Sequence, residues 1–314
     1  MNALNVLFSY IIFPGFLFSS IAGLLASWVD RKVSARLQWR KGPPWYQNFV
    51  DIVKLWGKEV IVPEGAKATF LIAPYIGLLS VVFVSTILGL VMLSGQQSFA
   101  GDLIVVVYLL IVPALAVIIG ACASGNPLAS VGASREMKLV LSYELPFILV
   151  VIAIILKAKG ALGLESIIGH QQLLSSHIYS TTGLWGFSYS GILGFFVAIV
   201  CMQAKLGLAP FDIAEAEQEI MGGVLIEYSG LPLALFKLTK SILLYAMPLF
   251  LIVLFLGKDI SPLFLVLKYV GLLVVIILIK NTNPRLKIHQ AMKFFWGPVS
   301  VAAVAAVVLA LFGL

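Results

Sequence analysis

The sequence predicts an all-helical protein that crosses a membrane about eight times. Of its 314 residues, 61% are hydrophobic and 11% are charged, and the mean hydropathy is +1.06. Soluble domains carry about 25% charged residues, so this composition is typical of an integral membrane protein. The apolar runs are continuous and do not alternate with polar residues, which favours helices over the strands of a membrane barrel.

Eight segments are long enough to cross the bilayer, because a helix needs about 20 apolar residues to span the hydrocarbon core. They belong to a single transmembrane domain, residues 1–314. The predicted spans are residues 5–29, 68–95, 103–123, 139–157, 186–208, 230–256, 262–281 and 294–314. The first run is too long for the core of a signal peptide and follows no basic leader, so we expect it to remain as a helix.

The loops between the spans differ in their content of Lys and Arg, and this difference predicts the orientation. The loop of residues 30–67 holds eight, whereas the loops of the opposite face hold three (Lys157, Lys159 and Lys258). Loops rich in Lys and Arg stay on the cytoplasmic side of a membrane. We therefore expect both termini on the external face of the cell membrane. The expected cytoplasmic loops are residues 30–67, 124–138, 209–229 and 282–293.

The first cytoplasmic loop contains a predicted amphipathic helix. If this segment winds as a helix, its lysines fall largely on one face and its large apolar side chains on another. The apolar face consists of Trp45, Phe49, Ile52, Val53 and Trp56. Tryptophan on the apolar side and lysine on the polar side are typical of a helix that lies in the membrane interface. Such a helix is a simple anchor, a roof for a cavity at headgroup depth, or a platform for a partner.

The loop of residues 209–229 is acidic, although it lies on the positive side of the membrane. It holds five of the chain's 14 carboxylates and no Lys or Arg; they are Asp212, Glu215, Glu217, Glu219 and Glu227. Spacings of three and seven residues place Asp212, Glu215 and Glu219 on one helical face, where like charges repel. Coupled carboxylates have some pKa values raised, which suits a proton relay. A solvated acidic loop is the alternative.

Several charged residues fall inside predicted spans, among them Glu144, Lys237, Lys240 and Lys268. A charge near the bilayer centre costs ~2.5–3.5 kcal/mol on insertion scales, so such residues usually face a hydrated interior. Together they predict a polar path through the bundle. For Glu144 and Lys237, a side chain that reaches back to the interface is the alternative.

The sequence predicts no metal site and no catalytic residue on this chain. Its two cysteines, Cys122 and Cys201, lie in apolar runs, and its three histidines are scattered. Iron–sulfur clusters and tetrahedral zinc sites need about four such ligands together. The chain also lacks a nucleophile–base motif and a phosphate-binding loop.

Three longer elements carry a family resemblance. They are Arg36-Leu37-Gln38-Trp39-Arg40-Lys41-Gly42-Pro43, then Lys54-Leu55-Trp56-Gly57-Lys58-Glu59, and the stretch from Ala209-Pro210-Phe211-Asp212 to Glu227-Tyr228-Ser229-Gly230. Together with Ser142-Tyr143-Glu144 they resemble the complex I subunit 1 family. This is the membrane subunit beneath the peripheral arm of respiratory complex I, and the resemblance covers nearly the whole chain.

The resemblance implies a role for most of these charged residues. The carboxylates of the acidic loop and Glu144 would begin the proton path that couples redox chemistry to ion pumping. The cost of charges inside spans adds Lys237, Lys240 and Lys268 to the predicted path. A second group of basic residues would form the chamber rim and the docking surface: Arg36, Arg40, Lys58 and Arg135.

Departures from the respiratory pattern point to one branch of this family. The element Ala133-Ser134-Arg135-Glu136-Met137-Lys138 replaces an Arg-Ala-x-Ala-Gln element, and it is similar to the homologous subunit of group 4 membrane-bound nickel–iron (NiFe) hydrogenases and related sulfur-reducing complexes. Lys240 stands where respiratory members commonly have Glu, and His289 replaces an Asp.

We therefore expect the membrane-anchor and ion-coupling subunit of a ferredoxin-oxidising hydrogenase. The resemblance places no cofactor on this chain, and puts the NiFe centre and the iron–sulfur clusters on partner subunits of the peripheral arm. Antiporter-like membrane subunits and lipid are the other expected partners; the net charge of +7 follows the membrane orientation and does not indicate nucleic acid. The alternatives are a sulfur-reducing or quinone-reducing complex, or a stand-alone cation/proton antiporter.

Overall fold

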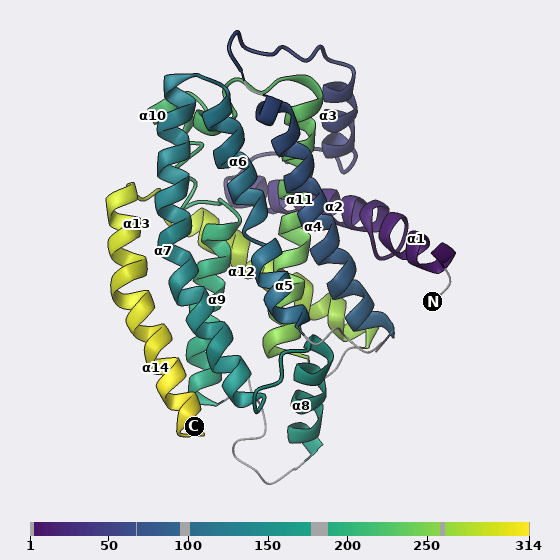
Figure 1. Ribbon diagram of the computed structural model, residues 1–314, viewed down its shortest axis with the longest axis vertical. Helices are drawn as coiled ribbons and strands as arrows, with labels where there is room; N and C mark the ends of the chain where they lie inside the picture. The colour runs from purple at the N-terminus through teal and green to yellow at the C-terminus, as the bar shows by residue number, and fades with distance from the viewer. Residues whose placement is uncertain (1–2, 67, 95–100, 177–187, 258–260, 314) are drawn as a thin grey trace.

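The computed structural model describes residues 3–66, 68–94, 101–176, 188–257 and 261–313, and every regular element in these ranges is a helix (Figure 1). The α-helices are α1 (Ala3–Ile11), α2 (Phe16–Leu37), α3 (Gln47–Trp56), α4 (Ala68–Ser94), α5 (Asp102–Leu109), α6 (Val112–Ala123), α7 (Pro127–Lys157), α8 (Leu164–Ser176), α9 (Tyr189–Lys205), α10 (Glu217–Ile220), α11 (Gly230–Phe255), α12 (Pro262–Thr282), α13 (Ile288–Phe294) and α14 (Ser300–Leu311). A π-helical turn, Phe295–Val299, joins the last two.

Within the described ranges, seven helical stretches are long and apolar enough to cross a membrane, and Tyr189–Lys205 is a shorter apolar helix. The seven are Leu7–Leu37, Ala68–Met92, Asp102–Ala123, Pro127–Lys157, Gly230–Phe255, Pro262–Thr282 and Ile288–Leu311. With the shorter helix, they correspond one to one to the predicted spans. The predicted all-helical, polytopic membrane fold is confirmed.

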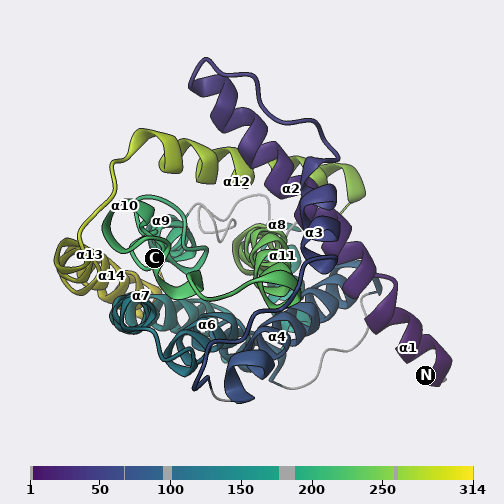
Figure 2. The ribbon, with the colours of Figure 1, turned by 90° about the horizontal axis from the view of Figure 1, so that it is seen from above.

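Helix α11 lies at the centre of the bundle. Seen from above, it stands end-on between α2, α3, α4 and α9, while α7 and α14 stand upright at the far side (Figure 2). Its apolar side chains fill the main core cluster, in which Ile242, Met247 and Phe250 are fully buried. A helix that is apolar all round is expected at such a place.

Helix α2 does not run parallel to the bundle. Both views show α1 and α2 crossing the upper half of the molecule at a steep angle to α4 and α7 (Figures 1 and 2). The crossing is close, because a Cβ atom at Gly23 would lie 2.5 Å from the backbone oxygen of Ser241 on α11. The helix also continues to Leu37, eight residues past the predicted span, since the apolar length of a helix is not its full length.

Two other helices begin before their predicted spans. Helix α7 starts at Pro127 because the side chain of Asn126 accepts a hydrogen bond from the backbone N–H of Leu128, and proline fits the first helical position. Most of the predicted loop 124–138 is therefore helical, including Arg135. Similarly, α13 begins at Ile288, inside the predicted loop 282–293.

The acidic loop 209–229 forms only two short helical pieces, α10 and the turn Gly223–Leu225. Gly222 and Gly223 both have positive φ, and a Cβ atom at Gly223 would lie 2.1 Å from the backbone oxygen of Ala214. The loop therefore folds back on itself, and one continuous helix with Asp212, Glu215 and Glu219 on the same face does not form.

The amphipathic helix predicted in the first loop is α3, which packs beside α2 and α11. Its apolar residues divide between two environments. Phe49 and Ile52 pack against the main core cluster, whereas Trp45, Val53 and Trp56 are exposed. Helix α8 lies at the opposite end of the molecule from α3 (Figure 1) and has no counterpart in the predicted spans.

Candidate functional site: a charged cavity and a path of carboxylates

A cavity of about 900 Å³ lies between α2, α3, α11, α12 and the segment that follows α9. Its lining includes residues of α3 and of the acidic loop. Helices α2 and α12, which also line it, lie at the same edge of the molecule in the view from above (Figure 2). Of the 25 described residues that line it, ten carry a formal charge and none is aromatic. Such a lining is suited to water and ions.

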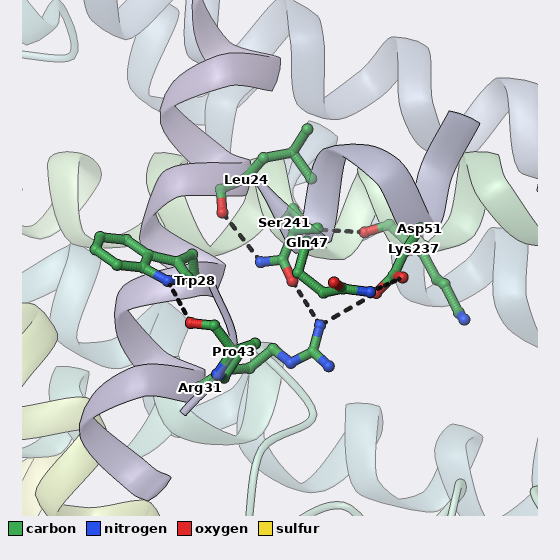
Figure 3. Close-up of polar contacts among 9 residues, drawn as sticks. Leu24, Trp28, Arg31, Pro43, Gln47, Asp51, Lys237 and Ser241 are labelled. Carbon is green, nitrogen blue, oxygen red and sulfur yellow. Dashed lines mark hydrogen bonds and ion pairs between the residues drawn. The ribbon is translucent and has the colours of Figure 1, made fainter. Parts of the chain in front are cut away.

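The wall between α2 and α3 is held by hydrogen bonds (Figure 3). Asn48 on α3 donates to the backbone oxygen of Leu24 at 3.2 Å and accepts from Arg31 at 2.5 Å. The same Arg31 guanidinium pairs with Asp51 at 3.3 Å. Lys237 on α11 also lines the cavity, and its side chain extends away from these contacts (Figure 3). These bonds fix α3 as a rim of the cavity.

The opposite wall joins α2 to α12. The Lys280 amine lies 2.7 Å from the carboxylate of Asp30, which is buried, and Asn281 donates to the hydroxyl of Ser34 at 3.0 Å. The long-range pairing of Lys and Asp here satisfies a carboxylate that would otherwise be costly to bury.

Asp212 lies where the acidic loop meets the end of α12. Its Oδ2 atom is 2.8 Å from Arg285, and its Oδ1 atom is buried with no hydrogen-bond partner among the described residues. Burial raises the pKa of Asp212 above its ordinary value, and the nearby Arg285 only partly offsets this effect. Asp212 therefore binds a proton at a higher pH than an exposed aspartate does.

A second, smaller cavity of about 50 Å³ adjoins the first. Both are lined by Asp212 and by the ion pair of Glu215 with Lys240 on α11. The smaller cavity is also lined by Glu136 on α7 and Lys205 on α9. The charged lining thus continues from the large cavity into the interior of the bundle.

At the inner side of the small cavity, Lys205 forms an ion pair with Glu144. The Lys205 amine lies 3.2 Å from Oε1 and 3.0 Å from Oε2 of this carboxylate, and 4.3 Å from the centre of the Phe147 ring. Only 2% of the Lys205 side chain is exposed. The pair and the cation–π contact hold two charges that neither residue could carry alone at this depth.

The sequence model of the NADH dehydrogenase family matches residues 9–311, nearly the whole chain. This protein belongs to the NADH dehydrogenase subunit 1/H family. The H subunit of the NADH-quinone oxidoreductase of Bacillus cytotoxicus is 30% identical over 307 residues, which cover 91% of this chain and 87% of that relative. The corresponding subunit of Brevibacillus brevis is 30% identical over 291 residues, 86% of this chain and 82% of the relative.

A solved structure agrees with this assignment. A chain of the membrane-bound sulfane sulfur reductase, an archaeal respiratory membrane complex, superimposes with a TM-score of 0.86 and 26% identity. The match covers 98% of this chain and 99% of that one. As a member of the subunit 1/H family, this chain is a multi-pass membrane subunit of a complex I-like, multi-subunit respiratory complex.

The subunit 1/H fold brings some of the predicted path residues together. Asp212, Glu215 and Lys240 share both cavities, and Lys237 lines the larger one. Glu144 does not line the smaller cavity but forms an ion pair with Lys205, which does.

Other predicted path residues lie apart from this group. Glu219 is exposed and pairs with Arg135 at the surface, and Glu227 accepts a hydrogen bond from Asn126. Lys268 donates to the backbone oxygen of Leu256 at 2.7 Å, at the end of α11 remote from the cavity. The side chain of Glu217 lies outside the described part of the structure.

The basic residues predicted for the rim also separate into groups. Arg40 lines the large cavity, whereas Arg36 and Lys58 are exposed outside it. Arg135 is held by Glu219. On the surface around the cavity, Trp39 is 99% exposed beside Arg40.

Sequence reasoning missed Glu136 and Lys205. Glu136 falls in the predicted loop 124–138. The capping residue Asn126 and Pro127 indicate that α7 begins before Glu136 and includes it. Lys205 had a plainer signal, a lysine in the last turn of an apolar helix. In the described part of this subunit 1/H protein, no group of three or more His, Cys, Asp or Glu residues could hold a metal ion.

Proposed function

We propose that this chain is the membrane-anchor and ion-translocation coupling subunit of a complex I-like, ferredoxin-oxidising, membrane-bound NiFe hydrogenase. It docks the peripheral redox arm and supplies an acidic proton path to the membrane pump. The observation that carries the second role is the continuous charged lining from the large cavity, through the small one, to Lys205 and Glu144.

The proposed path uses groups that exchange protons at the boundary of each cavity. Asp212 takes up a proton from the large cavity, because burial favours its neutral form. The proton then passes inward along the small cavity, first to Glu215, which is paired with Lys240, and then to Glu136. Glu144, with Lys205, receives it.

The docking role rests on the outer surface around the cavity. Arg36 and Lys58 are exposed cations, and Trp39, Trp45 and Trp56 are exposed aromatic side chains of the same region. Tryptophan and arginine are enriched at protein interfaces. Under the proposed orientation, with both termini external, this surface faces the cytoplasm and the peripheral arm.

The lining of the large cavity favours a redox partner other than quinone. Quinone-sized ligands usually bind in pockets lined mainly by apolar and aromatic side chains. Here ten of the 25 described lining residues are charged, and none is aromatic. A stand-alone antiporter is not proposed, because chains of this family are subunits of respiratory complexes.

A sulfur-reducing complex is the second candidate. It is favoured by the likeness to the chain of the sulfane sulfur reductase complex over nearly the full length. In such a complex this chain would have the same anchoring and coupling role, because the acceptor chemistry lies on another subunit.

The metal content of the native complex distinguishes these candidates. The complex is extracted in mild detergent, and nickel and iron are measured per copy of this chain. Stoichiometric nickel together with many irons supports the hydrogenase. Iron without nickel rejects the hydrogenase and favours the sulfur-reducing complex. If the chain purifies alone and without either metal, the subunit role itself is contradicted.

A further inference from the structure

The large cavity carries an excess of positive charge. Its described lining includes six basic and four acidic residues, which gives a net charge of +2. Each acidic residue has a basic partner: Asp30 with Lys280, Asp51 with Arg31, Asp212 with Arg285, and Glu215 with Lys240. The two remaining cations are Arg40 and Lys237, whose side chains have no ion-pair or hydrogen-bond partner among the described residues.

This excess charge is concentrated by the shape of the site. A concave surface with low-dielectric walls focuses the electrostatic potential and raises the local concentration of anions. Basic pockets between transmembrane helices on the cytoplasmic side bind the headgroups of anionic lipids. Within each of the four ion pairs on the walls, the positive and negative charges largely cancel. An anion in the cavity therefore interacts chiefly with Arg40 and Lys237.

An apolar strip leads away from the cavity along α12. Asn281 lines the cavity, and Val270, Val274 and Leu278 precede it by eleven, seven and three residues on the same helical face. These three side chains are 49%, 42% and 45% exposed. The cavity is therefore continuous with a surface on which acyl chains can lie.

We propose that the cavity binds the phosphodiester headgroup of an anionic phospholipid, with Arg40 and Lys237 as its cationic contacts and the acyl chains along α12. The proposal goes beyond the coupling role and does not depend on it. A free phosphate would satisfy the two cations but would make no use of the apolar strip. A lipid uses both features, and it is available from the surrounding bilayer.

Retained lipid in the purified complex provides the first test. The native complex is extracted in mild detergent, and bound phospholipid is identified and counted by mass spectrometry. We expect the double variant Arg40→Gln/Lys237→Gln to retain several-fold less anionic phospholipid than the wild type. The matched control is Lys41→Gln/Lys54→Gln, which removes two exposed cations that do not line the cavity.

The control variant should retain the wild-type amount of lipid, and Arg40→Lys/Lys237→Arg should restore binding because it keeps both charges. Assembly is checked by the size of the complex on a native gel. Equal lipid content in the wild type and the assembled Gln double variant would overturn the proposal. If the Gln double variant does not assemble, the single variants Arg40→Gln and Lys237→Gln are measured in the same way and by the same criterion.

A competition experiment separates the two sources of phosphate. The complex, washed free of lipid in detergent, is titrated with spin-labelled phosphatidylglycerol, and the immobilised fraction is measured by electron paramagnetic resonance. We expect unlabelled phosphatidylglycerol to displace the probe, and phosphatidylcholine and inorganic phosphate to displace it weakly. If inorganic phosphate displaces the probe as effectively as unlabelled phosphatidylglycerol does, the cavity is a free-phosphate site. That result would overturn the lipid assignment.

Discussion

The amine of Lys205 on α9 lies 3.0 Å from Oε2 of Glu144 on α7, in the interior of the bundle. Both charges are shielded from solvent, and each is the other's counter-ion. Removal of one partner from such a pair leaves an uncompensated buried charge. This relationship makes the pair a structural element of the bundle as well as the inner end of the proposed path.

The first prediction concerns this pair. Lys205→Met should lower the free energy of unfolding by ~3–5 kcal/mol, because Glu144 then keeps a buried charge without a partner. The double variant Lys205→Met/Glu144→Gln should recover most of the loss, since no charge remains buried. Unfolding is followed in detergent by circular dichroism. A single variant as stable as the wild type would show that the pair contributes nothing.

The second prediction concerns Glu136, which lines the smaller cavity together with Lys205. Glu136→Gln keeps the size and hydrogen-bonding shape of the side chain but cannot accept and release a proton. It should slow proton translocation by about 100-fold or more, because a positioned acid–base group contributes roughly 10²–10⁴-fold.

Glu64→Gln is the matched control for Glu136, because Glu64 is exposed and lines neither cavity. It should translocate protons at the wild-type rate. Both variants are measured in the complex, reconstituted into vesicles with a pH-sensitive dye inside. Equal rates for Glu136→Gln and the control would remove Glu136 from the path.

The third prediction concerns the protonation of Asp212. Its pKa is raised by burial, so its neutral form predominates to a higher pH than for an exposed aspartate. Because the folded state favours the protonated form, Asp212 makes the fold less stable as pH rises from the ordinary aspartate pKa through the raised one. Infrared spectroscopy, with Asp212→Asn to assign the carboxyl band, measures this titration.

Arg285→Gln tests the cause of the Asp212 shift. Arg285 lowers the pKa of Asp212 against the effect of burial, so its removal should raise that pKa further. A carboxyl band that titrates at the ordinary aspartate value in the wild type, or that moves down in Arg285→Gln, would contradict this electrostatic account.

The fourth prediction concerns the crossing of α2 and α11. Gly23→Ala places a methyl group 2.5 Å from the backbone oxygen of Ser241. Because neither backbone can yield cheaply, we expect a loss of stability of ~1–3 kcal/mol. Gly271→Ala is the control, since a Cβ atom there meets nothing within 4 Å. Thermal unfolding of the two variants gives the comparison, and a Gly23→Ala variant as stable as Gly271→Ala would show that α2 can shift.

Much of the fold could be predicted from the sequence, because the physical rule is simple. Continuous apolar runs of about 20 residues must become helices in a bilayer. The same rule placed the starts of α7 and α13 too late. It counts only the apolar run, whereas both helices begin in the more polar residues that precede it. The cap at Asn126 was the local signal for α7.

The candidate site could be predicted only in part. The cost of a buried charge marked Glu144 and Lys240 as interior residues. In the structure, Glu144 forms an ion pair with Lys205, and Lys240 forms one with Glu215. The partner of Glu144 could not be predicted, because Lys205 is 61 residues away in the chain and the pair depends on how α7 and α9 pack. Glu219 shows the reverse error: helical spacing suggested a shared face, but the folded loop carries it to the surface.

The measurement that tests the coupling role most directly is the number of protons translocated per electron pair by the complex with Glu144→Gln. The complex is reconstituted into vesicles, and electron transfer and internal acidification are recorded together. We expect Glu144→Gln to assemble, although less stably because Lys205 keeps a buried charge without its partner, and to keep electron transfer. The number of protons per electron pair should fall well below the wild-type value. A wild-type ratio in the assembled variant would contradict the proposal that this subunit passes protons through Glu144.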